Sequence, residues 1–180
     1  MYQLDNNSIM KKIFIFLGLA VAFSSCEDEV AFNETTLQAK INYQHIRFDH
    51  HEAFVENGNL LIKGGTETDS IEINIPNYTF GTRYELSNGN FSVNFKTVSE
   101  NSDTLIFHTN SDLDGYVFLN AVEDQTPGSI SGSFAFDMEM EDFGDIGLNT
   151  SIRFHDGVML NIPIHNNAPE VIEDEEVAEE

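Results

Sequence analysis

The sequence predicts an all-β fold: a single antiparallel β-sandwich or flattened barrel of about 9–11 short strands. Apolar and polar residues alternate over most of the chain, as in Ile71, Ile73 and Ile75, which is the period of a strand with one buried face. Asn-Gly and Asp-Gly pairs separate apolar runs and supply the positive φ angles of tight hairpin turns. After the apolar run near the N-terminus, no long stretch keeps a helical period.

The first predicted strands follow one another closely. Leu37, Ala39, Ile41 and Tyr43 alternate with polar residues and indicate one strand that buries all four side chains. The Asn57-Gly58 pair predicts a type I′ turn between two further strands. The predicted strands in this half are 36–43, 45–49, 52–56, 59–64, 70–76 and 82–87.

The second half shows the same alternation, with Phe134, Phe136 and Met138 in one of its longest runs. Asn88-Gly89 predicts a hairpin turn before the first of these strands, and Asp156-Gly157 predicts the turn of a terminal hairpin. The predicted strands are 90–98, 103–109, 115–122 and 129–138, followed by the hairpin over 150–164.

Composition restricts the classes of function. The chain has 180 residues and a formal net charge of −23, so its surface would repel nucleic acid, and we expect no nucleic-acid partner. Eleven of its 15 Phe residues fall in the predicted β domain and provide a core that needs neither a metal nor a disulfide. The single cysteine excludes an intrachain disulfide.

Residues 1–25 are predicted to be a lipoprotein signal peptide. Lys11 and Lys12 precede the apolar run 13–23, which is too short to span a membrane, and small residues lead to Cys26. The polar residues before Met10 are atypical of a signal, so we expect Met10 to be the true start. The segment resembles a bacterial lipobox, which implies acyl chains on Cys26 and stable membrane anchoring. The alternative is an ordinary signal peptide with an incidental cysteine.

The mature chain is predicted to have three parts. Residues 26–34 form a lipidated, acidic tether, 35–165 the β domain, and 166–180 an acidic disordered tail. In lipoproteins of the Bacteroidota type, an acidic cluster such as Glu27-Asp28-Glu29 resembles a signal for export to the outer face; the alternative is a solvated tether. Residues 35–169 contain 19 acidic and 6 basic residues, a net charge of −13.

Several turn and core motifs carry a family resemblance over about residues 36–164. They are Leu37–Asn42, Gly58–Gly64, Ile71–Ile75 with Phe80–Tyr84, Ile130–Phe136, and Asp156-Gly157-Val158. With the signal, this pattern resembles small flavobacterial-type Bacteroidota lipoproteins that contain a domain of unknown function. The chain departs from them at His45-Ile46, where a Trp is frequent, and in its acidic 137–145 segment. The resemblance implies an all-β envelope lipoprotein and no particular activity.

One acidic segment is a candidate calcium site. Asp137, Glu139, Glu141, Asp142 and Asp145 supply oxygen ligands of the kind calcium prefers, with Gly144 allowing a tight bend. The alternative is a solvated strand face that leads into a loop. We expect no other cofactor.

Other candidate sites are weaker. His50 and His51 are adjacent, so in a strand only one of them could serve a metal. Ser70 and Thr104 lie in Asp-Ser-Ile and Asp-Thr-Leu triplets that resemble an O-glycosylation signal of exported Bacteroidota proteins, although such pairs are also ordinary turn chemistry. No nucleophile motif is present, and we expect no enzyme activity.

We therefore expect a lipid-anchored outer-membrane domain that faces the exterior and acts as a non-enzymatic binding or accessory module. Its partners would be the membrane, through the acyl anchor, and an envelope protein, a glycan or a small ligand. Two alternatives are a calcium-dependent adhesin-like domain and a lipocalin-like carrier of an apolar ligand. The carrier would need an open apolar interior.

Overall fold

The computed structural model describes residues 34–99, 102–140 and 151–166, and this part of the chain is all-β. Two single-turn 3₁₀ helices, Leu86–Asn88 and Val122–Asp124, interrupt the strands. The strands are β1 (Thr36–Ile41), β2 (Gln44–Phe48), β3 (His50–Glu56), β4 (Asn59–Gly65), β5 (Asp69–Ile75), β6 (Arg83–Glu85), β7 (Ser92–Val98), β8 (Thr104–His108), β9 (Gly115–Leu119), β10 (Ser129–Met140) and β11 (Ser151–His165).

The eleven strands form one hydrogen-bonded sheet in the order β2-β1-β11-β3-β4-β5-β7-β8-β10-β9-β6. β10 and β11 also pair with each other, which closes β3, β4, β5, β7, β8, β10 and β11 into a ring. β10 reaches β8 only through its last residues, Glu139 and Met140. β11 reaches β3 only through Ile164 and His165. Each of the two front strands therefore joins the rear strands at its own C-terminal end. Because β10 and β11 are antiparallel, the β10–β8 and β11–β3 contacts lie at opposite ends of the β10–β11 pair.

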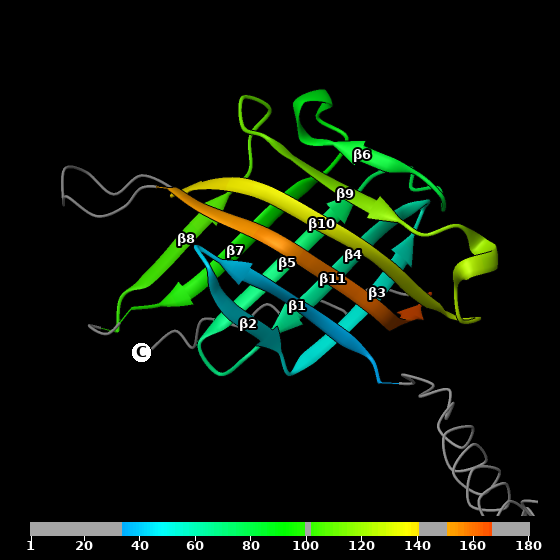
Figure 1. The fold of residues 1–180 in the computed structure, drawn as a ribbon, viewed down its shortest axis with the longest axis horizontal. Helices are drawn as coiled ribbons and strands as arrows, with labels where there is room; N and C mark the ends of the chain where they lie inside the picture. The colour runs from blue at the N-terminus through cyan, green and yellow to red at the C-terminus, as the bar shows by residue number, and fades with distance from the viewer. Residues whose placement is uncertain (1–33, 100–101, 141–150, 167–180) are drawn as a thin grey trace, which may run out of the picture. The chain divides into compact units, whose positions relative to one another are not determined.

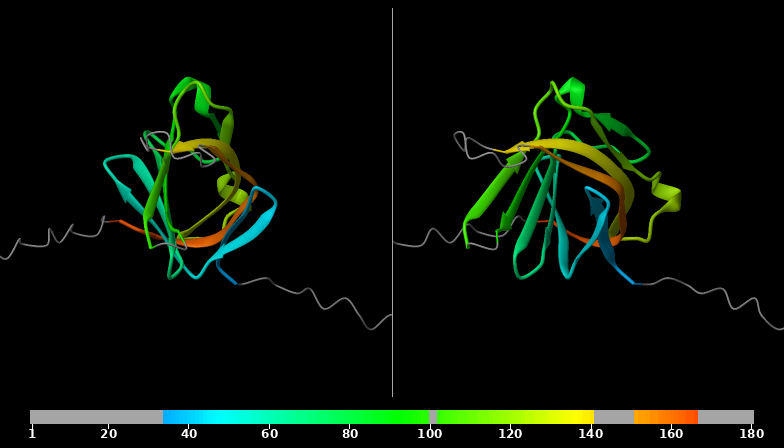
Figure 2. Two further views of the ribbon diagram at one scale, coloured as in Figure 1. Left: turned by 90° about the vertical axis from the view of Figure 1, so that its left-hand side faces the viewer. Right: turned by 60° about the vertical axis from the view of Figure 1, so that its left-hand side comes forward.

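This connectivity produces two layers (Figure 1). The front layer contains β2, β1, β11, β10, β9 and β6, and the rear layer contains β3, β4, β5, β7 and β8. The front strands run across the rear strands, as in orthogonally packed sheets whose corners are made by strands that pass from one layer to the other. Figure 2 shows both layers from the side. The predicted sandwich and the predicted flattened barrel thus describe two aspects of one structure.

The space between the layers is filled by apolar side chains, among which several phenylalanine rings contact one another. Phe136 of β10 contacts the rings of Phe134 and Phe154, at centroid distances of 5.4 and 5.2 Å. Phe95 of the rear layer meets Phe154 edge-on at 5.1 Å, which joins the two layers. Such pairs add to the stabilisation that burial itself provides. The centre of the ring is therefore packed, which argues against a carrier with an open interior.

The terminal hairpin predicted over 150–164 is wrong, because β11 is one continuous strand. Asp156 has the positive φ of 52° that its sequence predicts, but it forms a bulge where β11 shifts register against β10. Gly157 lies against Phe134, and a Cβ there would be 2.5 Å from the Phe134 ring. The close approach of this ring explains the glycine, and the long pairing with β10 keeps the strand extended.

Three further expectations need correction. Asn88-Gly89 ends a 3₁₀ helix, with Gly89 as its left-handed cap, and does not join paired strands, since β6 pairs with β9. β1 ends at Ile41, and Asn42 and Tyr43 form a turn with φ angles of 47° and 74°, so Tyr43 is 88% exposed instead of buried. The sheet is mixed, because β11 and β3 pair in parallel. The Asn57-Gly58 turn between β3 and β4 is confirmed.

Within the part of the chain that the structure describes, no helix has the length and apolar character needed to cross a membrane.

Candidate functional site

The outer surface of the front layer contains a hollow of about 380 Å³, crossed by β6, β9, β10 and β11. We call it the cation–aromatic groove and define it by Arg83, Tyr116, Asp137, Arg153 and His155. Its middle is low because Ala135, opposite Tyr116 in the register, carries only a methyl group between larger neighbours. The groove therefore lies between one group of side chains on β6 and β9 and another on β11.

The first wall consists of Arg83 and Tyr116. The Arg83 guanidinium carbon is 3.6 Å from the centroid of the Tyr116 ring, a cation–π contact. Arg83 Nε also donates to Glu85 Oε1 at 2.5 Å, and this hydrogen bond is the main reason that the pKa of Arg83 is raised. The aromatic face is thus covered by a cation that a carboxylate holds in place.

The second wall is an ion pair between adjacent strands. Arg153 donates to Asp137 through Nε at 2.5 Å and through Nη2 at 2.6 Å, a bidentate pair that raises the pKa of Arg153. The Asp137 side chain is 23% exposed, while that of Arg153 is 63% exposed. The carboxylate is therefore largely used within the protein, and the guanidinium keeps further N–H donors toward solvent.

His155 and Tyr43 occupy the far end of the groove. Asn42 exchanges two 3.1 Å hydrogen bonds with the backbone of Arg153, through its N–H and its side-chain oxygen, which docks the β1–β2 turn on β11. The Tyr43 ring then meets the His155 ring edge-on at 5.0 Å, and the Tyr43 N–H donates to His155 Nε2 at 3.3 Å. This contact leaves the proton of a neutral His155 on Nδ1, which lies 3.4 Å from Asp156 Oδ2.

Every cation at the groove has a carboxylate partner. Besides the Arg83 and Arg153 pairs, Lys40 Nζ lies 2.7 Å from Asp156 Oδ2, and the hydrogen bond from Lys40 is the main cause that lowers the pKa of Asp156. The groove therefore combines fixed hydrogen-bonding groups and two tyrosine rings with little net positive charge. Such a surface suits a polar, uncharged ligand better than an anion.

The candidate calcium ligands are brought together only in part. Asp137 is bound by Arg153, and Glu139 Oε2 accepts a hydrogen bond from Asn110 Nδ2 at 2.9 Å. Glu141, Asp142 and Asp145 lie outside the described residues. Among the residues that are described, no group of three or more His, Cys, Asp or Glu side chains is arranged to hold a metal.

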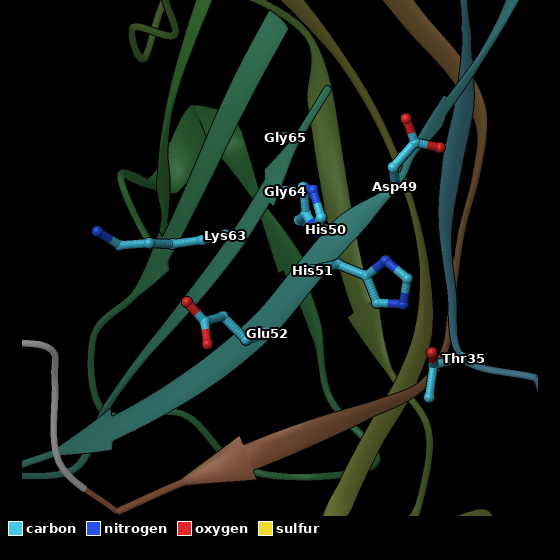
Figure 3. A pocket seen from close by; sticks show the side chains of 8 residues that line it. All are labelled: Thr35, Asp49, His50, His51, Glu52, Lys63, Gly64 and Gly65. Atoms are coloured by element: carbon cyan, nitrogen blue, oxygen red, sulfur yellow. The ribbon is translucent and has the colours of Figure 1, made fainter. Parts of the chain in front are cut away.

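His50 and His51 line a separate polar cleft of about 550 Å³ where β3 begins (Figure 3). The His51 ring is turned toward Thr35, whereas Glu52 and Lys63 extend in the other direction. His51 Nδ1 also lies 3.0 Å from the carbonyl oxygen of Phe48. As expected from strand alternation, the two histidines differ in exposure, and the groups around the cleft do not converge on one point.

The other predicted sites are the glycosylation residues and the lipidation segment. Ser70 is exposed on β5, and Thr104 is exposed at the start of β8, so both hydroxyls are accessible. Nothing in the structure tests their modification. Cys26 and Glu27-Asp28-Glu29 lie outside the described residues.

Residues 33–163 match the family described as Domain of unknown function (DUF6252). The chain belongs to this family. The matched segment includes β1 to β10 and most of β11, so the cation–aromatic groove lies within the DUF6252 domain. The expected membership of a family of unknown function is confirmed, while the lipoprotein character and the taxonomic range stay predictions. No curated protein and no solved structure matches the chain significantly.

Local sequence patterns do not bring the groove residues of the DUF6252 domain together as a group. Arg83 and Arg153 are two of only three arginines in the chain, and both occupy outward positions on their strands. That rarity on an acidic domain is a usable signal. Their separation of 70 positions conceals the relationship until the strand order is known.

Proposed function

We propose that this DUF6252 protein is a lipid-anchored, non-enzymatic binding module of the outer membrane that faces the exterior. Cys26 would carry the acyl anchor, and Glu27-Asp28-Glu29 would direct export to the outer face. These assignments rest on the sequence pattern around the cysteine. The acidic tether and the β domain would then hold a recognition surface away from the anionic membrane.

The observation that carries the binding function is the cation–aromatic groove. Exposed ion pairs contribute only about 0–1 kcal/mol each to stability, so stability alone is a weak reason to order two arginines here. Once ordered, Arg83 and Arg153 present planar donors at fixed positions, and the exposed Glu85 carboxylate supplies acceptors. Tyr116 holds the Arg83 guanidinium in place, and the exposed ring of Tyr43 adds surface for the apolar faces of a ligand.

A neutral glycan fits this combination best. Sugar hydroxyls require paired donors and acceptors, while the C–H faces of the ring pack on aromatic side chains. The pairing of each groove cation with a carboxylate removes the attraction for a sulfated or phosphorylated ligand. The net charge of −13 over residues 35–169 acts in the same direction.

Glycan binding by the mature protein tests this proposal. Screening immobilised neutral glycans should identify a binder whose affinity falls at least tenfold, or about 1.4 kcal/mol, in Tyr116→Ala and in Arg153→Gln. Lys96→Gln is the matched control, because Lys96 is exposed on β7 of the rear layer. Equal binding by Tyr116→Ala and by the control would contradict the groove as the binding surface.

A further inference from the structure

A second hollow, of about 350 Å³, lies at one end of the strand ring, between the two layers. It arises from the same alternation that builds the core. Phe154, Phe95 and Phe107 point inward, and the next inward positions toward this end are Ile152 on β11 and Thr97 on β7. We call this hollow the mouth and define it by the described residues that line it.

The inner part of the mouth is apolar. Ile41, Ile46 and Ile152 pack against the core but remain partly exposed, and Phe95 and Phe107 form the floor with their centroids 6.2 Å apart. Apolar surface left in contact with water in a concave site favours an apolar occupant, because binding removes that surface from water. The floor closes the hollow toward the packed centre of the ring, so the occupant is short.

The rim of the mouth is polar, and hydrogen bonds hold its carboxylate in place. Gln44, His45, Thr97 and Asp69 surround the opening. Asp69 Oδ2 accepts hydrogen bonds from the hydroxyls of Thr66 and Thr68, both at 3.1 Å, so a tight turn orients its carboxylate. A carboxylate at the rim of a domain with net charge −13 repels an anionic head group and favours a donor.

We propose that the mouth binds a single-chain amphiphile, with its alkyl chain on the isoleucine and phenylalanine lining and an amine or hydroxyl head at the rim. The site is independent of the cation–aromatic groove. On β11, Ile152 and Phe154 face the mouth and the core, while Arg153 and His155 face the groove on the other side of the sheet. The mouth can therefore be altered without touching the groove.

Two neighbouring substitutions by tryptophan, a residue that the chain otherwise lacks, test the mouth. Thr97→Trp places a large ring in the mouth, whereas Val98→Trp places the same ring on the outer face of the same strand, where Val98 is 44% exposed. The neutral fluorophore Nile red should bind the wild-type protein and Val98→Trp equally. Its affinity should fall at least tenfold in Thr97→Trp. Circular dichroism would check that both variants fold, and Gln44→Trp provides a second filling variant.

Competition by three ten-carbon compounds, each below its micellar concentration, tests the head group. Decylamine and decanol should displace Nile red and raise the Tm of the wild-type protein, whereas decanoate should be at least tenfold weaker. The proposal is overturned if Nile red does not bind the wild-type protein, if Thr97→Trp and Gln44→Trp bind it as Val98→Trp does, or if decanoate competes best. Loss of glycan binding in the groove variants would leave these results unchanged.

Discussion

Asp137 on β10 binds the guanidinium of Arg153 on β11 through both of its carboxylate oxygens. The two residues are directly opposite in the strand register, so the pair spans the seam where the ring closes. It also forms one wall of the cation–aromatic groove. One interaction thus links the strand pairing to the candidate binding surface and withdraws a carboxylate from the predicted calcium site.

Millimolar calcium should leave the Tm of the protein unchanged. Arg153 binds both carboxylate oxygens of Asp137, and Asn110 donates to Glu139 Oε2, so calcium would have to displace these partners. Differential scanning fluorimetry with and without calcium measures this. A rise in Tm that Asp137→Asn abolishes and Glu72→Gln preserves would instead support the calcium-dependent adhesin.

Replacing Tyr43 by glycine should stabilise the domain but weaken the groove. Tyr43 has a φ of 74°, and a non-glycine residue in this left-handed region costs on the order of 1 kcal/mol. Urea denaturation should show a gain of about 1 kcal/mol for Tyr43→Gly. Tyr43→Ala, which removes the ring but keeps the Cβ, should show no such gain. If alanine stabilises as much as glycine, the ring and not the backbone conformation is the source of strain.

Gly157→Ala should be one of the most destabilising single-methyl changes in the domain. A Cβ at this position would lie 2.5 Å from the ring and from the carbonyl oxygen of Phe134, and overpacking of this kind costs about 1–3 kcal/mol. Gly58→Ala is the comparison, since its Cβ meets nothing within 4 Å and only the positive φ of 82° opposes it. A smaller loss for Gly157→Ala than for Gly58→Ala would show that β11 moves away from Phe134 at little cost.

The Lys40–Asp156 pair should make stability depend on pH in the acidic range. The pKa of Asp156 is lowered in the folded state, mainly by the hydrogen bond from Lys40. The unfolded state therefore takes up a proton at higher pH than the folded state, so this contribution is present above about pH 4 and is lost as the pH falls through the lowered pKa. The Tm difference between the wild-type protein and Asp156→Asn should shrink over that range, most clearly at low salt. In a Lys40→Met background the difference should vary less with pH, because only the smaller contribution of His155 remains; an undiminished variation would assign it to another group.

Local sequence signals predicted the strands well, but they did not predict whether a residue with positive φ forms a turn or a bulge. Asn57-Gly58 and Asp156-Gly157 carry the same preference for positive φ, yet the first forms a hairpin turn and the second a bulge. The difference comes from Phe134, whose ring occupies the space beside Gly157 and whose strand continues past the bulge. Such a partner, far away in the sequence, is invisible to a local pattern.

The two candidate sites show the same division. The alternation of Ile152, Arg153, Phe154 and His155 predicts which side chains share a face of β11. Arg153 meets Asp137 because β11 pairs with β10. Arg83 lies beside the same groove because β6 pairs with β9, which in turn pairs with β10. The alternation of Leu37, Ala39 and Ile41 predicts that Tyr43 is also buried. Tyr43 is exposed because the strand ends and a turn starts at Asn42.

The fate of Cys26→Ala in cell fractionation tests the central claim of a tethered, outward-facing module most directly. The wild-type protein should sediment with outer membranes and be cleaved by protease added to intact cells, whereas Cys26→Ala should appear in the soluble fraction. Ser25→Ala, which keeps a small residue before the cysteine, serves as the control and should remain membrane-bound. Continued membrane association of Cys26→Ala would contradict lipid anchoring, and protection of the wild-type protein from external protease would contradict its display to the exterior.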